Sequence, residues 1–143
     1  MVYKTHSFSI SAAHRLWNPH LSVERNKLFF GKCCNTHGHN YCIEITLRGL
    51  VNDETGLVIS EKVFDDTVWQ ILSQFDCEGE INELPIFNQH IATTENFCIR
   101  LWELLSNLLT EAAHKDEGAG RDVNLFQITI RETDRNIFTY FGA

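Results

Sequence analysis

The clearest pattern along the chain is a strict alternation of side chains in two separate segments. In residues 2–10, Phe8 and Ile10 share one face with every second residue before them, and serine and threonine dominate the other face. In residues 40–51, apolar side chains such as Ile43 again take every second position. A period of two is that of a half-buried β-strand. We therefore expect strands over both segments, joined by a long connection that carries most of the chemically interesting residues.

The middle of the chain changes to the helical period. Apolar residues from Phe64 to Phe75 recur at spacings of three and four positions, which places them on one stripe of a helix. Ser60 is a favourable N-cap for that helix, and the short apolar run 57–59 before it predicts a short strand. The charged segment 76–92 predicts a loop.

A second amphipathic helix and two final strands complete the pattern. The helix is expected to begin behind Thr93 or Thr94, to carry a stripe of leucines, and to end near His114. Alternating residues after a glycine-containing turn predict strands over 123–131 and 136–141. The order strand, strand, helix, helix, strand, strand (ββααββ) indicates an α+β fold with a mostly antiparallel four-stranded sheet and two helices on one face.

Composition limits the classes of partner and compartment. The 143 residues, 43% of them apolar, suit a single domain over 1–143 with one core. A net charge of −7 disfavours binding to the phosphates of nucleic acid, and no apolar run is long enough to span a membrane. The five cysteines are odd in number and show no repeating spacing, so we expect reduced thiols in a soluble, cytoplasmic protein.

A pair of histidines precedes the second strand. His37 and His39 are two residues apart, so both imidazoles project to the same face if strand pairing begins there. His14, just past the first strand, is a candidate third ligand if the two strands pair. Three neutral imidazoles suit a catalytic zinc ion that keeps one position open. On spacing alone, surface or hydrogen-bonded histidines are the simpler explanation, because such pairs often arise by chance.

Cys33 is the candidate reactive group of the same connection. It lies four residues before His37, and the neighbouring Lys32 favours a lowered thiol pKa. It can serve as a nucleophile, a general base or a fourth metal ligand, or it can be a buried loop thiol. The adjacent Cys34 indicates that one of the two cysteines has only that structural role.

These residues occur within longer runs that resemble a known family. Residues 8–16, which read FSISAAHRL, and residues 28–41, which read LFFGKCCNTHGHNY, are similar to the 6-pyruvoyltetrahydropterin synthase and 6-carboxytetrahydropterin synthase family. Later landmarks of the same family match residues 56–59, 93–96 and 131–133. The resemblance covers nearly the whole chain, which makes it far more specific than the histidine spacing.

The resemblance implies a role for each matching side chain. The implied zinc ligands are His14, His37 and His39. Cys33 matches the cysteine that transfers a substrate proton, Glu132 matches the carboxylate that anchors the N–H edge of the pterin ring, and Thr94 falls in a region that lines the pterin pocket. A helix N-cap explains Thr94 almost as well.

The resemblance also implies the assembly and the substrate. Family members share a tunnelling-fold module, in which four antiparallel strands carry two helices on one side. Several copies close the barrel, as a homohexamer built from two trimers with active sites at subunit interfaces. The implied substrate is a small-molecule pterin, 7,8-dihydroneopterin triphosphate, whose side-chain hydroxyls zinc would polarise. The basic residues nearest the motif are Arg15, Lys27 and Lys32.

One position departs from the family pattern. Members with the full catalytic set carry Asp-His after the first helix, whereas this chain has Asp76 followed by Cys77. Three explanations remain: Cys77 acts as the acid or base, His90 replaces the missing histidine, or the proton relay is lost. The third explanation leaves a protein with altered chemistry or with pterin binding alone.

The product implied by the resemblance depends on the branch of the family. The spacing from Cys33 to His37 resembles the 6-carboxytetrahydropterin synthases of queuosine synthesis, whereas Asn35 and the pair Asn40-Tyr41 resemble the 6-pyruvoyl branch. We favour a zinc-dependent carbon–oxygen lyase of the carboxy type. The alternatives are a 6-pyruvoyltetrahydropterin synthase and a non-catalytic pterin-binding homologue.

Overall fold

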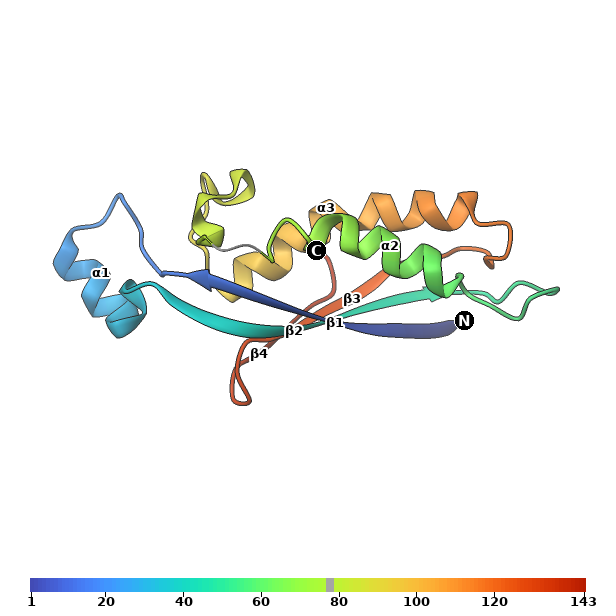
Figure 1. Ribbon diagram of the computed structural model, residues 1–143, viewed down its shortest axis with the longest axis horizontal. Coiled ribbons are helices and arrows are strands. Elements are labelled where there is room, and N and C mark those ends of the chain that lie inside the picture. Colours follow the sequence, from blue (N-terminus) through green and yellow to red (C-terminus); the bar gives the residue numbers. More distant parts are fainter. Residues whose placement is uncertain (77–78) are drawn as a thin grey trace.

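The alternating segments form one antiparallel sheet in the computed structural model, which describes residues 1–76 and 79–143. The strands are β1 (Val2–His14), β2 (His37–Gly49), β3 (Asn124–Arg131) and β4 (Ile137–Tyr140). They lie in the order β1-β2-β3-β4, so each strand is hydrogen-bonded to the next one in the sequence (Figure 1). This confirms the predicted four-stranded antiparallel sheet.

The register of β1 and β2 is continuous over the full length of both strands. Val2 pairs with Gly49 at one end, and His14 pairs with His37 at the other. Since side chains alternate between faces, Phe8 and Ile10 on β1 lie on the same buried face as Ile43 on β2. Residues that share this face at the His14 end are therefore brought together.

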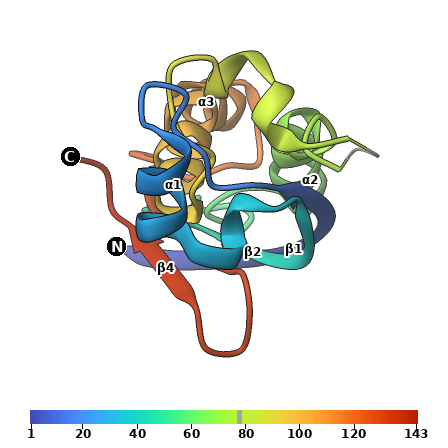
Figure 2. The same ribbon diagram turned by 90° about the vertical axis from the view of Figure 1, so that its left-hand side faces the viewer.

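Two long helices cover the buried face of the sheet. They are α2 (Glu61–Leu72) and α3 (Thr94–Lys115), and both lie on the same side of the strands (Figures 1 and 2). Their apolar stripes meet the sheet: Phe64 and Val68 of α2 and Phe97 and Leu101 of α3 have no exposed surface. The two predicted helices are confirmed, and their packing against the sheet forms the core.

Two elements differ from the sequence expectation. Residues 57–59 do not form a strand; Val58 and Ile59 are buried, and the carbonyl of Val58 accepts the Gly120 N–H at 3.0 Å. The apolar run 57–59, which has no alternation of apolar and polar residues, is therefore a loop that packs into the core and not a strand. The predicted connection between the first two strands contains a third helix, α1 (Val23–Phe30), with Leu28 74% exposed. The apolar side chains Val23, Leu28 and Phe29 of α1 are exposed and its buried residue is Asn26, so no apolar stripe in the sequence marks this helix.

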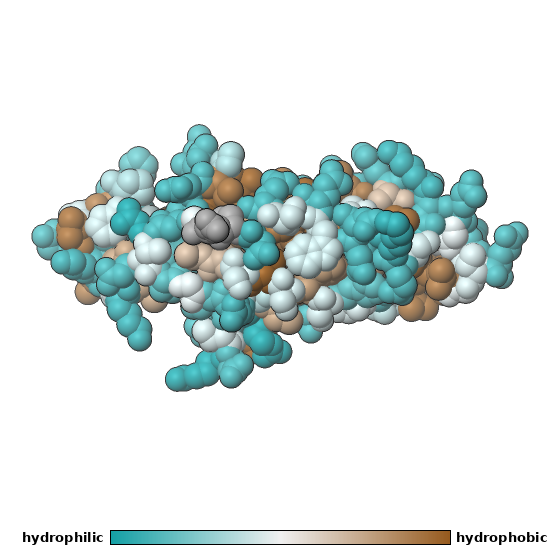
Figure 3. Space-filling view, viewed as in Figure 1, coloured by the Kyte–Doolittle hydropathy of each residue, from teal (hydrophilic) through white to brown (hydrophobic). Residues whose placement is uncertain are grey.

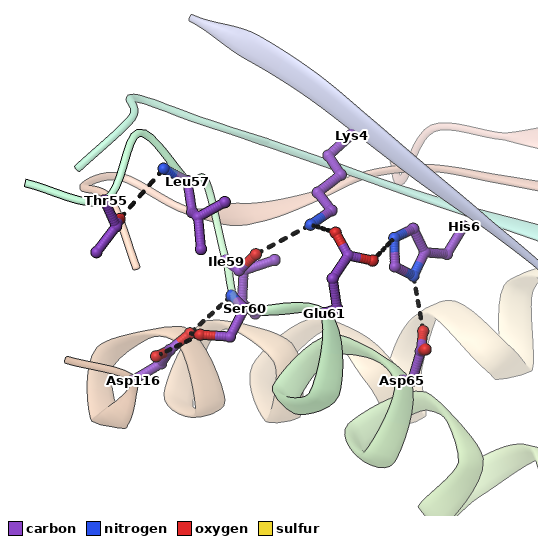
Figure 4. Close-up of polar contacts among 9 residues, drawn as sticks. All are labelled: Lys4, His6, Thr55, Leu57, Ile59, Ser60, Glu61, Asp65 and Asp116. Atoms are coloured by element: carbon purple, nitrogen blue, oxygen red, sulfur yellow. Dashed lines mark hydrogen bonds and ion pairs between the residues drawn. The ribbon is translucent and has the colours of Figure 1, made fainter. Parts of the chain in front are cut away.

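Polar contacts join β1 to the beginning of α2 at the end of the sheet near the N-terminus (Figure 4). The Lys4 ammonium donates to the Ile59 carbonyl at 3.0 Å and pairs with Glu61. The ring nitrogens of His6 lie 2.8 Å from the Glu61 carboxylate and 2.6 Å from that of Asp65. The start of α2 is thereby held against β1.

A second contact at the same end joins the two long helices. The Ser60 residue that caps α2 donates its backbone N–H to Asp116 at 2.8 Å, and its hydroxyl donates to the same carboxylate. Asp116 is the C-cap of α3. One carboxylate therefore connects the end of α3 to the beginning of α2 (Figure 4).

The face of the molecule seen in Figure 3 is mainly hydrophilic, with apolar groups in several separate places. The helices of the described residues include none that is both long enough and apolar enough to cross a membrane.

Candidate metal and pterin site

Three histidines converge where β1 ends and β2 begins. His14 and His37 are cross-strand partners, and His39 lies two residues further along β2, opposite Ala12. One nitrogen from each ring lies within 4.8 Å of the other two. His14 is the last residue of β1 and does not lie beyond it as expected, because strand pairing continues to that position. The predicted grouping of the three imidazoles is confirmed.

Backbone carbonyls orient two of these rings. The Nδ1–H of His14 donates to the carbonyl of Ala92 at 2.8 Å, and the Nδ1–H of His37 donates to the carbonyl of Asn35 at 2.7 Å. A carbonyl only accepts, so in both rings Nδ1 carries the proton. The Nε2 lone pairs are thus available to a ligand, which is the usual arrangement behind a metal-binding histidine.

The donor set fits a divalent metal ion. The Nε2 atoms of His14 and His39 are buried and have no hydrogen-bond partner among the described residues, although buried polar atoms are normally paired. Burial lowers the pKa of both residues, and the His37 imidazole acts in the same direction. The Glu132 carboxylate opposes this shift without reversing it. Neutral, converging imidazoles are the ligands that zinc prefers.

A carboxylate lies beside the three rings. Glu132 follows the last residue of β3, and its Oε1 atom is 3.6 Å from the Nε2 atoms of both His14 and His39. The Thr94 hydroxyl donates to the same oxygen at 2.6 Å. Thr93 is the N-cap of α3, since its side chain accepts the Asn96 N–H. Thr94 therefore has no capping role, and its hydroxyl orients Glu132.

The ring of Tyr41 packs against two of the three histidines. It is 1% exposed, and its ring centroid lies 5.4 Å from that of His39 and 6.1 Å from that of His14. Burial raises the pKa of its phenol, and Glu132 raises it further, against a smaller opposite effect of the Thr94 hydroxyl. The buried hydroxyl has no hydrogen-bond partner within the described ranges 1–76 and 79–143.

The two adjacent cysteines have different surroundings. Cys33 lies in a 3₁₀ turn, Gly31–Cys34, and its carbonyl accepts the N–H of Leu16 at 2.8 Å, two residues beyond His14. The Cys34 thiol donates to the carbonyl of Asn26 at 3.3 Å inside the helical segment. Cys34 therefore has a structural role, while the Cys33 thiol has no such assignment. The group of converging metal-ligand atoms contains three imidazoles and not Cys33.

Of the remaining candidates for the relay, Asp76 and His90 make their side-chain hydrogen bonds to groups other than the three histidines. Asp76 accepts the backbone N–H of Ser11 at 2.9 Å on the outer edge of β1. Cys77 lies outside the described residues. The Nε2 atom of His90 accepts a hydrogen bond from Arg100 at 3.2 Å. Within one chain, the geometry assigns no proton relay to Asp76 or His90.

A family sequence model described as 6-pyruvoyl tetrahydropterin synthase matches residues 2–143. The chain belongs to this family.

Similar proteins cover most of this family member. The human 6-pyruvoyl tetrahydrobiopterin synthase is 32% identical over 140 residues, which are 94% of this chain and 87% of the human protein. The solved structure of Caenorhabditis elegans 6-pyruvoyl tetrahydropterin synthase is 33% identical, with a TM-score of 0.86, and the match covers 99% of this chain and 96% of that one. An Archaeoglobus fulgidus protein named as a candidate 6-carboxy-5,6,7,8-tetrahydropterin synthase is 32% identical over 100 residues, 70% of this chain and 72% of its own length.

A cavity of this pterin synthase family member was not predicted from the sequence. It has a volume of about 980 Å³ and lies between the connection after β1 and the segment before α3. Its lining includes Arg15, Trp17, Asn82, His90 and Asn96. Asn82 accepts the N–H of Arg15 at 3.0 Å and donates to its carbonyl at 2.8 Å, across 67 positions of sequence. No local pattern marks such a contact. Of the three basic residues nearest the motif, only Arg15 lines this cavity.

Proposed function

We propose that the protein is a zinc-dependent carbon–oxygen lyase, over a single domain of 1–143, that acts on 7,8-dihydroneopterin triphosphate. The observation that carries the proposal is the juxtaposition of three imidazoles with a hydrogen-bonded carboxylate. His14 and His39 each present a buried, unpartnered nitrogen 3.6 Å from Glu132. Such a site combines a metal position with an acceptor for the N–H edge of a pterin.

Each residue of the site has a separate task. Glu132 accepts two N–H hydrogen bonds from the aminopyrimidinone edge, while the Thr94 hydroxyl fixes the direction of the carboxylate. A zinc ion held by His14, His37 and His39 would supply Lewis-acid polarisation of the substrate hydroxyls. The Cys33 thiolate removes or returns the neighbouring proton. Its turn is fixed to the end of β1 through the hydrogen bond from Leu16.

We propose that the active form is a homohexamer of two trimers, in which copies of the sheet close a barrel. The outer edge of β1 supports this assembly. In the described residues, this 13-residue edge makes one backbone bridge, between Ala13 and Glu80, and one contact from Asp76 to Ser11. A long edge strand pairs readily with another chain. Asp76 is then positioned at a subunit interface. The four described cysteines are free thiols, which supports a cytoplasmic location.

For the product, we propose the 6-pyruvoyl compound first. The human and Caenorhabditis elegans relatives, which match 94% and 99% of this chain, carry the 6-pyruvoyl name, whereas the Archaeoglobus fulgidus relative with the 6-carboxy name matches 70% of it. The spacing between Cys33 and His37 supports the 6-carboxy product as the second candidate. A non-catalytic pterin-binding protein is the third candidate, because Cys77 occupies the position of the relay histidine.

Turnover by the purified, zinc-loaded protein tests the proposal. We expect conversion of 7,8-dihydroneopterin triphosphate, with a product mass that identifies the 6-pyruvoyl or the 6-carboxy compound. Cys33→Ala should reduce turnover by about 10²- to 10⁴-fold, the range for a lost general acid or base, and should retain zinc. The matched variant Cys34→Ala removes a thiol one position away and should keep its turnover. Pterin binding without conversion by the unmodified protein would contradict the lyase and support the non-catalytic candidate.

A further inference from the structure

The Tyr41 hydroxyl is not explained by the fold. The ring packs against Phe97 of α3, with 5.6 Å between centroids, and against the imidazoles of His14 and His39. A phenylalanine would supply the same ring contacts. The oxygen adds a buried polar atom that has no protein partner in the described part of the chain. Native cores seldom keep such an atom unless something outside the fold pairs with it.

The groups around this hydroxyl do not satisfy it. Thr94 and Glu132 both lie close enough to act on the pKa of the phenol. The Thr94 hydroxyl donates its proton to Glu132 at 2.6 Å and keeps lone pairs that can accept, but the phenol oxygen has no partner within hydrogen-bond distance among the described residues. The Glu132 carboxylate, which can only accept, is turned toward Thr94 and the Nε2 atoms of the histidines. The phenol is therefore without a hydrogen-bond partner in the described residues, while the Glu132 carboxylate is near enough to raise its pKa.

We infer that the Tyr41 hydroxyl donates a hydrogen bond to the bound pterin, to the ring acceptor that flanks the N–H edge held by Glu132. This inference rests on the proposed function. A 2-amino-4-oxopteridine presents two N–H donors side by side, with a carbonyl oxygen on one side and a ring nitrogen on the other. Glu132 can pair with both donors, but it cannot pair with an acceptor. One phenol donor next to the carboxylate completes the match to this acceptor and donor pattern.

The substitution Tyr41→Phe removes only the oxygen. With zinc-loaded protein and neopterin as the probe, we expect the Kd measured by fluorescence titration to rise about tenfold, the effect of one hydrogen bond. In turnover, KM should rise by a similar factor while kcat changes little. The zinc content should stay the same, and the thermal midpoint should stay the same or rise, since an unpaired buried hydroxyl is removed.

Tyr3→Phe is the matched control, because it removes a phenol oxygen from a residue that is 53% exposed on β1. It should change none of these quantities. An unchanged neopterin Kd in Tyr41→Phe overturns the inference, and so does a lower thermal midpoint with loss of zinc, which would give the hydroxyl a structural role. If the unmodified protein holds zinc and binds no neopterin, the proposed function fails together with this inference.

Discussion

The two ends of the β1–β2 ribbon use polar side chains in opposite ways. Near the N-terminus, Lys4 pairs with Glu61, and His6 offers one ring nitrogen to Glu61 and the other to Asp65. At the other end, buried polar atoms lack partners among the described residues; they include the Nε2 atoms of His14 and His39 and the Tyr41 hydroxyl. Ten residues of β1, about 33 Å, separate Lys4 from His14.

The difference does not come from the kind of side chain. His6 and His14 lie on the same strand and face the same layer of helices, yet one is fully paired and the other is left with a free lone pair. Paired groups stabilise the fold, whereas buried unpaired groups cost stability unless a ligand restores the contact. The comparison therefore separates an end that holds the molecule together from the end at which we propose that a metal ion and a substrate bind.

The largest effect is expected when the same substitution is made at both ends. His37→Ala should reduce the metal content from about one zinc per chain at least tenfold, because a three-imidazole site cannot retain the ion with two ligands. Turnover should disappear with it. His6→Ala should keep the zinc and lower the thermal midpoint instead. Metal analysis and thermal unfolding of the isolated proteins measure both, and zinc retained by His37→Ala would remove the distinction between the two ends.

Sequence patterns were sufficient for the sheet and the two long helices, because each buries a periodic face. Sequence patterns failed in two kinds of segment: a loop whose residues are buried without a regular spacing, and a helix that buries no apolar face. Val58 and Ile59 are buried in a loop, and α1 exposes Leu28. The last residues of β1 also lack a strong strand signal, since Ala12 and its neighbours take their conformation from pairing with β2.

The site was predictable only in part. The ordered family motifs predicted the three histidines and Glu132. The pairing of β1 with β2 explains why the three histidines lie together. The carbonyl of Ala92 that orients His14 is 78 positions away, and the bond between Thr94 and Glu132 spans 38. Contacts of that kind depend on tertiary packing, which no local spacing encodes. The unpaired Tyr41 hydroxyl follows from the same packing.

A smaller gain is expected from restoring the histidine that family members carry at position 77. Cys77→His returns the group that best transfers protons near neutral pH, so turnover should rise at least about tenfold if the relay is lost. Zinc content and neopterin affinity should not change. Single-turnover measurement of product formation reports the chemical step. A companion variant, His90→Gln, should leave the turnover of the unmodified protein intact; a large loss would make His90 the substitute acid or base.

The smallest effect is expected at the paired end, from Asp116→Asn. Loss of the charge-assisted bonds to Ser60 should lower the free energy of unfolding by about 1–2 kcal/mol, with zinc content and turnover unchanged. Asp66→Asn, which removes an exposed partner of Lys62, is the matched control and should leave stability unaltered. Urea unfolding of both variants at pH 7 provides the measurement.

The pH dependence of the same variant identifies the charge as the cause. Partial burial alone would raise the pKa of Asp116, but hydrogen bonds from Ser60 and Gly118 hold that pKa below its ordinary value of 3.8. A carboxyl with a lowered folded-state pKa contributes stability above its unfolded pKa and loses that contribution as pH falls through the folded value. The stability difference between the unmodified protein and the Asp116→Asn variant should therefore be full at pH 7 and shrink below about pH 4. If the difference in unfolding free energy between the two proteins is the same at pH 2 as at pH 7, the negative charge of Asp116 is not the cause of the stabilisation.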